Sequence, residues 1–281
     1  APSATGPLHL GSILAALVSY IHAKQHHGDW LIRIDDLDKK RCKQIHVESI
    51  LECLDAFGFR PSASVCRQTD RITDYQNALV SLENQRRLYP CTCSRKSLPK
   101  GPYPGFCRHQ IGQTLIAESA VRIDTSDIDL TVDDLIATSS IIQPPGDFIV
   151  KRRDGLFAYQ LACAVDEQID GITHVIRGID LLDSMPMQRF ITQCLGYESP
   201  TYGHFPVLVG ADGAKLSKQT FAEPVDWTRP GETFAVIARL LLLNNTPGPT
   251  EHAQVWLDYF VSLDNLIPML IKASQANTLS L

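Results

Sequence analysis

The sequence opens with the stretch APSATGPLHLGS, residues 1–12, which leads directly into an apolar run with helical spacing. Proline and glycine mark the stretch as a loop, and the apolar run predicts a helix over residues 13–27 that stops at Gly28. The loop thus places hydroxyl and imidazole side chains against a helix N-terminus: Ser3, Thr5, His9 and Ser12. Free N–H groups and the positive end of the helix dipole bind anions there, so we expect a polyphosphate. An ordinary N-capped surface helix would carry the same residues. A second feature of the sequence is therefore needed to distinguish it from an anion-binding site.

The second feature is the stretch GADGAKLSKQ, residues 210–219. Its glycines give a flexible loop that delivers Lys215, Ser217 and Lys218. Such a stretch is an ordinary exposed turn when it stands alone. Together with the first stretch, in this order and separated by a body with α/β character, it is a much more specific signal than either stretch alone.

Composition limits the class of protein. The chain has 281 residues, of which 44% are hydrophobic, and a net charge of −5. No apolar run reaches membrane-spanning length and no secretory signal opens the sequence, so we expect a cytoplasmic monomer with no membrane partner. The eight cysteines are scattered, which does not favour a disulfide framework. The negative charge counts against a general nucleic-acid binder, although one basic stripe could still hold RNA.

Between the two loops, strand and helix patterns alternate, which predicts an α/β fold with a parallel sheet. A strand over residues 30–36 ends on Asp35 and Asp36, where open α/β sheets bind ligands. Further strands are expected at 120–124, 148–152, 173–178 and 204–209. Helices are expected at 47–57, after a cap at Asp74, and at 157–167, 182–195, 234–243 and 253–263, with a final segment near Leu266.

A small segment rich in turn formers interrupts this pattern. It reads YPCTC at 89–93 and GPYPGFCRH at 101–109, so Cys91, Cys93, Cys107 and His109 are neighbours in the sequence. Thiolates and imidazole suit tetrahedral Zn²⁺, and the segment has too little apolar content to hold itself together. Three unrelated thiols in a loop are the other interpretation. The spacing leaves the fourth ligand open between His109, the commoner donor, and Tyr103.

The motifs taken together resemble class I aminoacyl-tRNA synthetases. HLGS at 9–12 and KLSKQ at 215–219 resemble the two signatures of that class, and RIDDLD at 33–38 and GITHVIRG at 171–178 resemble its glutamyl branch. The cysteine cluster and YQLA at 159–162 are similar to the glutamyl-Q tRNA(Asp) synthetase family. The resemblance extends from Ala1 to about Gln219. It implies a Rossmann-like parallel sheet, an inserted zinc-containing α+β subdomain and a short helical C-terminal segment.

The resemblance also implies residue roles. The family's glutamate-contacting positions fall on Ser3, Asp35, Tyr159 and Arg177. Its catalytic and ATP-binding positions fall on His9, Gly11, Ser12, Lys215 and Lys218. Its zinc ligands fall on Cys91, Cys93, Tyr103 and Cys107. The implied partners are Mg-ATP, L-glutamate and a tRNA(Asp) that carries queuosine, whose wobble base accepts the glutamate.

Physical chemistry agrees with two of these roles. Asp35 can pair with an α-ammonium group, and the planar fork of Arg177 suits a side-chain carboxylate. Three positions depart from the usual pattern. Ala4 stands where Pro is usual and Asp35 where Glu is commoner. Cys163 stands where discriminating glutamyl enzymes have Asn, which favours the queuosine branch. The family also places an arginine two residues before its Ala-Pro-Ser, and we expect that arginine upstream of Ala1.

We expect four parts in the chain. Residues 1–88 and 148–219 would form the two halves of the catalytic domain, and 89–147 the inserted zinc-bearing, acceptor-binding-like subdomain. Residues 220–281 would form helices, too few for an anticodon-binding domain. Two alternatives remain: the catalytic fragment of an ordinary glutamyl-tRNA synthetase, and a catalytically silent RNA-binding relative. The short C-terminal part argues against the first, and the intact charged motifs argue against the second.

Overall fold

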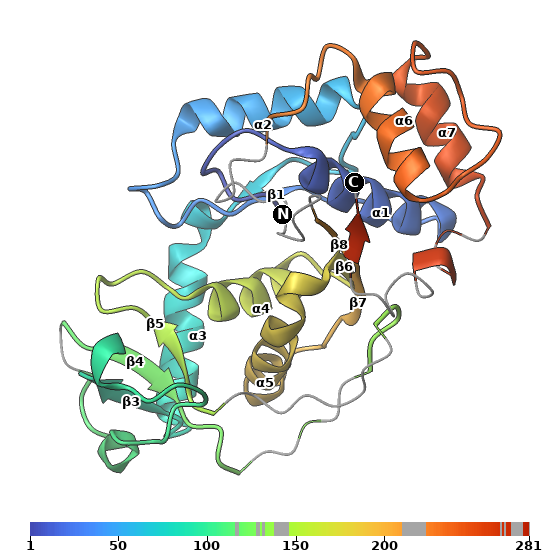
Figure 1. Cartoon of the computed structure of the whole chain (residues 1–281). Coiled ribbons are helices and arrows are strands. Elements are labelled where there is room, and N and C mark those ends of the chain that lie inside the picture. Colours follow the sequence, from blue (N-terminus) through green and yellow to red (C-terminus); the bar gives the residue numbers. More distant parts are fainter. Residues whose placement is uncertain are drawn as a thin grey trace.

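The computed structural model describes residues 1–115, 118–127, 130, 133–137, 146–209, 223–264, 266, 268–270 and 278–280 (Figure 1). The first helix, α1 (Leu10–Gln25), begins three residues before its predicted start. His9 is the N-cap, and its backbone N–H donates to the Ser12 hydroxyl at 3.5 Å. The capping interaction extends the helix into the polar loop, where periodicity of apolar residues gave no signal. The buried face of α1 carries Ile13, Leu14, Leu17, Val18 and Ile21.

The predicted parallel α/β character is confirmed. Strand β1 (Arg33–Ile34) pairs in parallel with β2 (Cys66–Arg67), and β6 (His174–Gly178) with β7 (Thr201–Phe205). A third parallel pair joins β8 (Val207–Val209) to β9 (Thr278–Ser280). The N-terminal loop extends the first pair, because Asp35 donates its N–H to the Pro2 carbonyl at 3.0 Å and Ser3 lies beside Asp35.

The prediction of one strand over 204–209 was wrong. The segment consists of two strands, β7 and β8, and Pro206 lies between them. Proline has no N–H for a ladder, so the chain changes partners at this residue. Strand β9 carried no recognised signal in the sequence.

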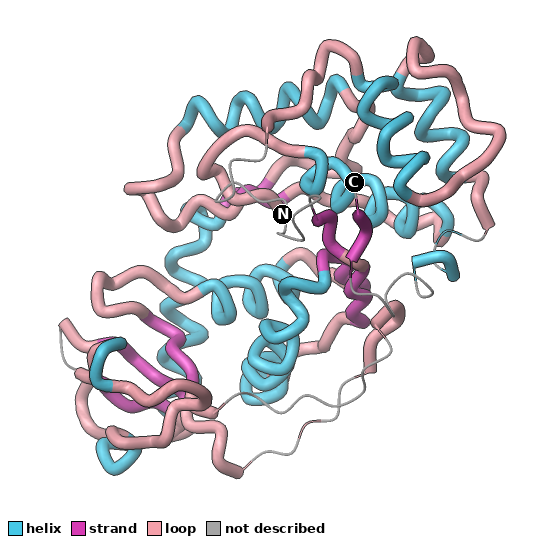
Figure 2. The backbone as a smooth tube through the Cα atoms, viewed as in Figure 1, coloured by secondary structure: helices cyan, strands magenta, loops and turns pink. Residues whose placement is uncertain are grey.

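The α-helices α2 to α7 lie around these strands (Figure 2). They are α2 (Gln44–Ala56), α3 (Ile72–Asn84), α4 (Tyr159–Ile169), α5 (Met185–Leu195), α6 (Pro230–Leu240) and α7 (Ala253–Val261). The predicted cap Asp74 lies inside the first turn of α3, whose N-cap is Arg71. The single helix expected over 182–195 is a 3₁₀ segment, Ile179–Ser184, followed by α5. Pro186 lies in the first turn of α5, where its missing N–H is tolerated.

An antiparallel sheet lies apart from the parallel strands, at the lower left of Figure 1. It consists of β3 (Leu88–Cys91), β4 (Ala120–Ile123) and β5 (Phe148–Lys151), with β4 in the middle. Strand β3 was not predicted, because the sequence around Cys91 is rich in turn-forming residues. The sheet places Cys91 at the end of a buried strand, and this strand leads directly into the loop that carries the other cysteines.

Two large apolar clusters hold the molecule together. One lies between α1, α2, α6 and α7 and includes Phe57, Phe234, Trp256 and Phe260, all fully buried. The other lies between α3, α4, α5, β4 and β5. None of the helices in the described ranges has the length and apolar content needed to cross a membrane.

Candidate active site

A cleft of about 1270 Å³ lies where the N-terminal loop, β1, α4 and β6 meet. Seven of the residues that the sequence predicted for ATP and glutamate line this one cleft: Ser3, His9, Gly11, Ser12, Asp35, Tyr159 and Arg177. Its volume suits a nucleotide and an amino acid together, because ligand cavities for single small molecules span roughly 300–1,000 Å³. The predicted lysines Lys215 and Lys218 lie outside the described residues.

The chain on both sides of residues 210–222 lies beside the N-terminal loop. Val207 and Leu208 of β8 line the cleft on one side. On the other side, Val225 donates its N–H to the Leu8 carbonyl at 3.1 Å, and Pro224 pairs with His9. The described chain that follows residues 210–222 therefore contacts the first signature motif at and next to His9.

Asp35 is held by an arginine that the sequence analysis did not select. Arg33 Nε donates to Asp35 Oδ1 at 2.8 Å and lies 3.3 Å from Asp166 Oδ2, while its Nη2 donates to Cys163 Sγ at 3.3 Å. Burial acts to lower the pKa of Arg33, but Cys163, Asp35 and Asp166 outweigh it and hold that pKa well above its usual value. Arg33 therefore stays charged and fixes the Asp35 carboxylate at the cleft. Alternate residues of a strand lie on one face, so the sequence could have indicated that Arg33 lies beside Asp35.

Cys163 lies between Arg33 and Tyr159 in the wall of the cleft. Burial raises the pKa of the Cys163 thiol to about 12, because Arg33 only partly offsets it. The thiol is therefore neutral. Tyr159, the first residue of α4, is 37% exposed at the same wall.

Arg177 is buried at the end of β6, with 9% of its surface exposed. Its Nε donates to His204 Nε2 at 2.9 Å, Nη1 to Gln188 Oε1 at 2.8 Å, and Nη2 to the Leu181 carbonyl at 3.4 Å. A guanidinium has five N–H groups. Among the described residues, these contacts leave one N–H on each terminal nitrogen, and such groups can donate to the oxygens of a carboxylate.

The residues that surround Arg177 were missed from the sequence. The guanidinium lies over the Tyr202 ring at 5.1 Å, and the Tyr202 hydroxyl donates to Glu167 Oε2 at 2.9 Å. His204 lies opposite Arg177 in the ladder between β6 and β7. Only the register of these strands brings His204 and Arg177 together, and two stretches of sequence do not reveal a register.

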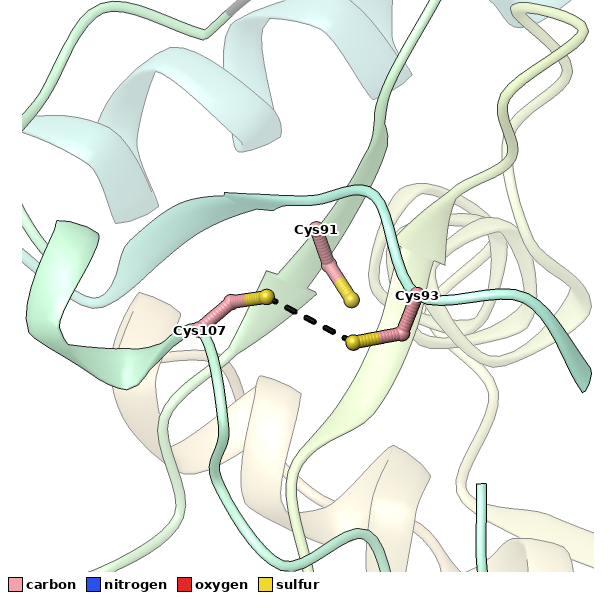
Figure 3. A group of neighbouring side chains, drawn as sticks. All are labelled: Cys91, Cys93 and Cys107. Atoms are coloured by element: carbon pink, nitrogen blue, oxygen red, sulfur yellow. Dashed lines mark hydrogen bonds between the residues drawn. The ribbon is translucent and has the colours of Figure 1, made fainter. Parts of the chain in front are cut away.

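The three predicted metal-binding cysteines form a second cluster (Figure 3). The Sγ atoms of Cys91, Cys93 and Cys107 all lie within 4.8 Å of one another, and those of Cys93 and Cys107 are 3.6 Å apart. Sulfur atoms around a tetrahedral zinc are separated by roughly 3.7 Å, from a Zn–S bond of about 2.3 Å. The thiols are thus spaced as metal ligands.

Tyr103 belongs to this cluster and His109 does not. The Tyr103 hydroxyl lies 3.5 Å from Cys91 Sγ and 3.7 Å from Cys93 Sγ. His109 is exposed, and its Nδ1 lies 3.0 Å from the Phe106 carbonyl. Arg122 supports the cluster, because its Nε donates to Cys91 Sγ at 3.3 Å and its guanidinium lies 3.7 Å above the Tyr103 ring. Burial tends to raise the pKa of Cys91, but Tyr103 and Arg122 lower it to about 7.

Comparison with known proteins decides the family. The family model described as "tRNA synthetases class I (E and Q), catalytic domain" matches residues 1–101 and 116–233. The chain is 42% identical over 254 residues to the glutamyl-Q tRNA(Asp) synthetase of Methylococcus capsulatus, covering 89% of this chain and 83% of that protein. It is 38% identical over 275 residues to that of Neisseria gonorrhoeae, covering 93% of each. The chain belongs to the glutamyl-Q tRNA(Asp) synthetase family.

The fold of this family member resembles that of a larger synthetase. A crystal structure of glutamate-tRNA synthetase from Elizabethkingia anophelis matches with a TM-score of 0.74 at 21% identity. The match covers 95% of this chain and 65% of that protein. At this identity, the likeness concerns the fold. It agrees with a class I synthetase architecture, as the two signature motifs predicted.

Proposed function

We propose that this member of the glutamyl-Q tRNA(Asp) synthetase family activates L-glutamate with Mg-ATP and transfers it to the queuosine base of tRNA(Asp). The observation that carries the proposal is Arg177, a buried guanidinium with two N–H groups left for a carboxylate, in the same cleft as the His9 loop. It acts, we infer, in the cytoplasm and as a monomer.

The residues of the cleft fit glutamate activation. Arg177 would receive the γ-carboxylate, and Asp35, fixed by Arg33, would receive the α-ammonium. Ser3 pairs with the backbone of Asp35, and Tyr159 lines the same wall, so both would contact the amino acid. Two charges at opposite ends of the substrate would thus hold its α-carboxylate toward the phosphates.

Adenylate formation requires attack of the α-carboxylate oxygen on the α-phosphorus of ATP and departure of pyrophosphate. Negative charge grows on the phosphate oxygens during this step. His9, Gly11 and Ser12 lie at the N-terminus of α1, where backbone N–H groups and the helix dipole favour that charge. Lys215 and Lys218 would supply the remaining positive charge, and the Mg²⁺ bound to ATP would shield the phosphates.

The cysteine cluster would hold one structural Zn²⁺, with Cys91, Cys93, Cys107 and Tyr103 as its ligands. Thiolates suit this metal, and the Tyr103 hydroxyl would complete a set of four donors. The metal would join the end of β3 to the loop before β4 and so stabilise residues 89–147 as a separate subdomain. We propose that this subdomain, inserted between catalytic halves 1–88 and 148–219, contacts the tRNA, and that 220–281 packs behind the active site.

Two assays test the proposed function. Glutamate-dependent exchange of pyrophosphate into ATP should proceed without tRNA, because the cleft holds the residues for both substrates. Labelled glutamate should then be transferred to tRNA(Asp) that contains queuosine and not to tRNA(Asp) that lacks it. Exchange that needs tRNA would point to an ordinary glutamyl enzyme. No exchange under any condition would point to a silent RNA-binding relative.

A further inference from the structure

A chain of three buried side chains leads from Arg177 to a short segment before β5. Asp134 Oδ2 lies 2.5 Å from His204 Nδ1, and His204 Nε2 lies 2.9 Å from Arg177 Nε. The side chains of Asp134 and His204 are fully buried. Neither residue lines the cleft. They therefore touch the proposed substrate only through Arg177.

Asp134 is held firmly in place by the backbone. Its Oδ1 accepts N–H groups from Ile136 at 2.9 Å, Ala137 at 2.7 Å and His204 at 3.0 Å. The neighbouring Leu135 donates its N–H to the Tyr202 carbonyl at 2.8 Å, so the segment runs along β7. One carboxylate oxygen thus anchors the segment, while the other faces His204.

The neighbours fix the tautomer of His204. Arginine can donate hydrogen bonds but cannot accept them. The contact with Arg177 Nε thus requires a lone pair on His204 Nε2, and the proton of the neutral ring must lie on Nδ1, facing Asp134. Protonation of the ring would set an N–H against an N–H of Arg177.

We propose that Asp134 and His204 are positioning residues for amino-acid selection, in which Asp134 holds the Nδ1–H tautomer of His204 and His204 orients Arg177 toward the substrate γ-carboxylate. The inference deepens the proposed function and rests on it. Burial lowers the pKa of His204 and, with a further contribution from Arg177, outweighs the opposing effect of the Asp134 hydrogen bond. Hydrogen bonds from His204 and the backbone outweigh burial and lower the pKa of Asp134, so the carboxylate stays charged.

Asp134→Asn is the first test, because it changes a hydrogen-bond direction at nearly constant volume. The amide oxygen can keep the backbone contacts of Oδ1, and the amide nitrogen then presents a donor to His204 Nδ1. The ring must change to the Nε2–H tautomer, which opposes Arg177 Nε. We expect the KM for glutamate to rise ~10-fold or more, the usual scale of one lost hydrogen bond to a charged group, and the KM for ATP to stay unchanged.

Two variants of His204 distinguish its effect on the orientation of Arg177 from its contribution to packing. In His204→Gln, the side-chain oxygen can take the place of Nε2 and accept from Arg177. In His204→Asn, the amide takes the place of Nδ1 and can reach Asp134 but not Arg177. The Gln variant should keep a KM for glutamate near that of the wild type. The Asn variant should raise it ~10-fold or more and should lower the preference for glutamate over glutamine.

Pyrophosphate exchange with both amino acids and ¹⁵N NMR of the imidazole rings give the result. Equal KM values for glutamate in wild type, Asp134→Asn and both His204 variants would overturn the inference, as would a wild-type His204 signal of the Nε2–H form. If Asp134→Asn does not fold, the His204 pair still decides. Wild-type protein without glutamate-dependent exchange would overturn the proposed function instead, so the two failures are distinct.

Discussion

Arg177 and Asp35 lie in one cleft, and on the proposed function they meet different charges of the substrate. The γ-carboxylate distinguishes glutamate from glutamine, whereas the α-ammonium is common to both. A buried guanidinium left without a carboxylate is costly, so we expect glutamine to be activated ~10³-fold less well than glutamate. Arg177→Ala should remove most of this preference, chiefly by weakening glutamate.

Asp35→Ala provides the control for Arg177→Ala. It should depress activation of both amino acids and leave their ratio nearly intact. Exchange kinetics with glutamate and glutamine in both variants make the comparison. If Arg177→Ala retained the full preference, the side-chain pocket would have to lie elsewhere.

His22 gives a prediction about acid stability. It lies in α1 with 8% of its surface exposed, beside His26 and His174, and neither ring nitrogen has a hydrogen-bond partner among the described residues. Burial, with smaller effects of the two neighbouring histidines, lowers its pKa from 6.5 to about 4. The folded protein thus binds fewer protons than the unfolded chain between these values, and stability falls as the pH is lowered from 6.5 to 4.

Replacing His22 should reduce the loss of folding stability at acid pH. In urea unfolding at a series of pH values, His22→Leu should remove up to about 3 kcal/mol of the decrease between pH 6.5 and 4. Curves for wild type and variant that run parallel over this range would show that His22 is not responsible.

The sequence analysis found residues that line the cleft more readily than the residues that support them. Ser3, His9, Asp35, Tyr159 and Arg177 were predicted from motifs, and all line the same cleft. Their supports were missed: Arg33 beside Asp35, and His204 and Gln188 beside Arg177. Arg33 had a local signal, its place two residues from Asp35 on one strand face. His204 and Gln188 are brought to Arg177 by strand register and helix packing, which a single stretch of sequence does not reveal.

At the scale of elements, the signature loop of residues 210–219 gives the next prediction. The described chain on either side of it contacts Leu8 or lines the cleft, and on the proposed function we expect Lys218 to neutralise phosphate charge. Lys218→Ala should lower kcat for adenylate formation ~10²-fold or more, as expected for the loss of one preorganised charge. A nearly normal kcat would make this stretch a surface turn.

The cysteine loop gives another prediction at this scale. Tyr103→Phe removes the hydroxyl that lies near two of the thiols and should weaken zinc binding, whereas His109→Ala should not. Metal analysis of freshly purified proteins, followed by competition with a chelator, compares the two variants. Full zinc retention in Tyr103→Phe would assign the fourth position to another donor. Wild-type protein without zinc would refute the metal site itself.

Element boundaries could be predicted only in part. Apolar periodicity found the helices, but caps and prolines set their ends, as at His9 for α1 and Pro186 for α5. Pro206 divided one predicted strand into two. The partner of β8 lies about 70 residues along the chain, far beyond the reach of local propensity.

At the scale of the whole molecule, α6 and α7 pack against α1 and complete the larger apolar cluster (Figure 1). Trp256 is fully buried there between Phe234 and Phe260, at ring-centroid distances of 6.2 and 5.7 Å. Trp256→Ala should reduce the free energy of unfolding by about 3–5 kcal/mol. Val255→Ala, at a neighbouring position that is 43% exposed, should change it by less than about 0.5 kcal/mol. Equal effects in urea denaturation would contradict this packing.

The pairing of β8 with β9 also affects the order in which parts of the chain can fold during synthesis. A chain is synthesised from its N-terminus, so β8 emerges long before residues 278–280 exist. Bringing such distant segments together costs conformational entropy, which is recovered when the two strands pair. Strand β8, which leads into residues 210–219, therefore cannot pair with β9 until β9 has been synthesised. On the proposed function, a nascent molecule would bring together the cleft residues Asp35 and Arg177 first and become able to form adenylate only late.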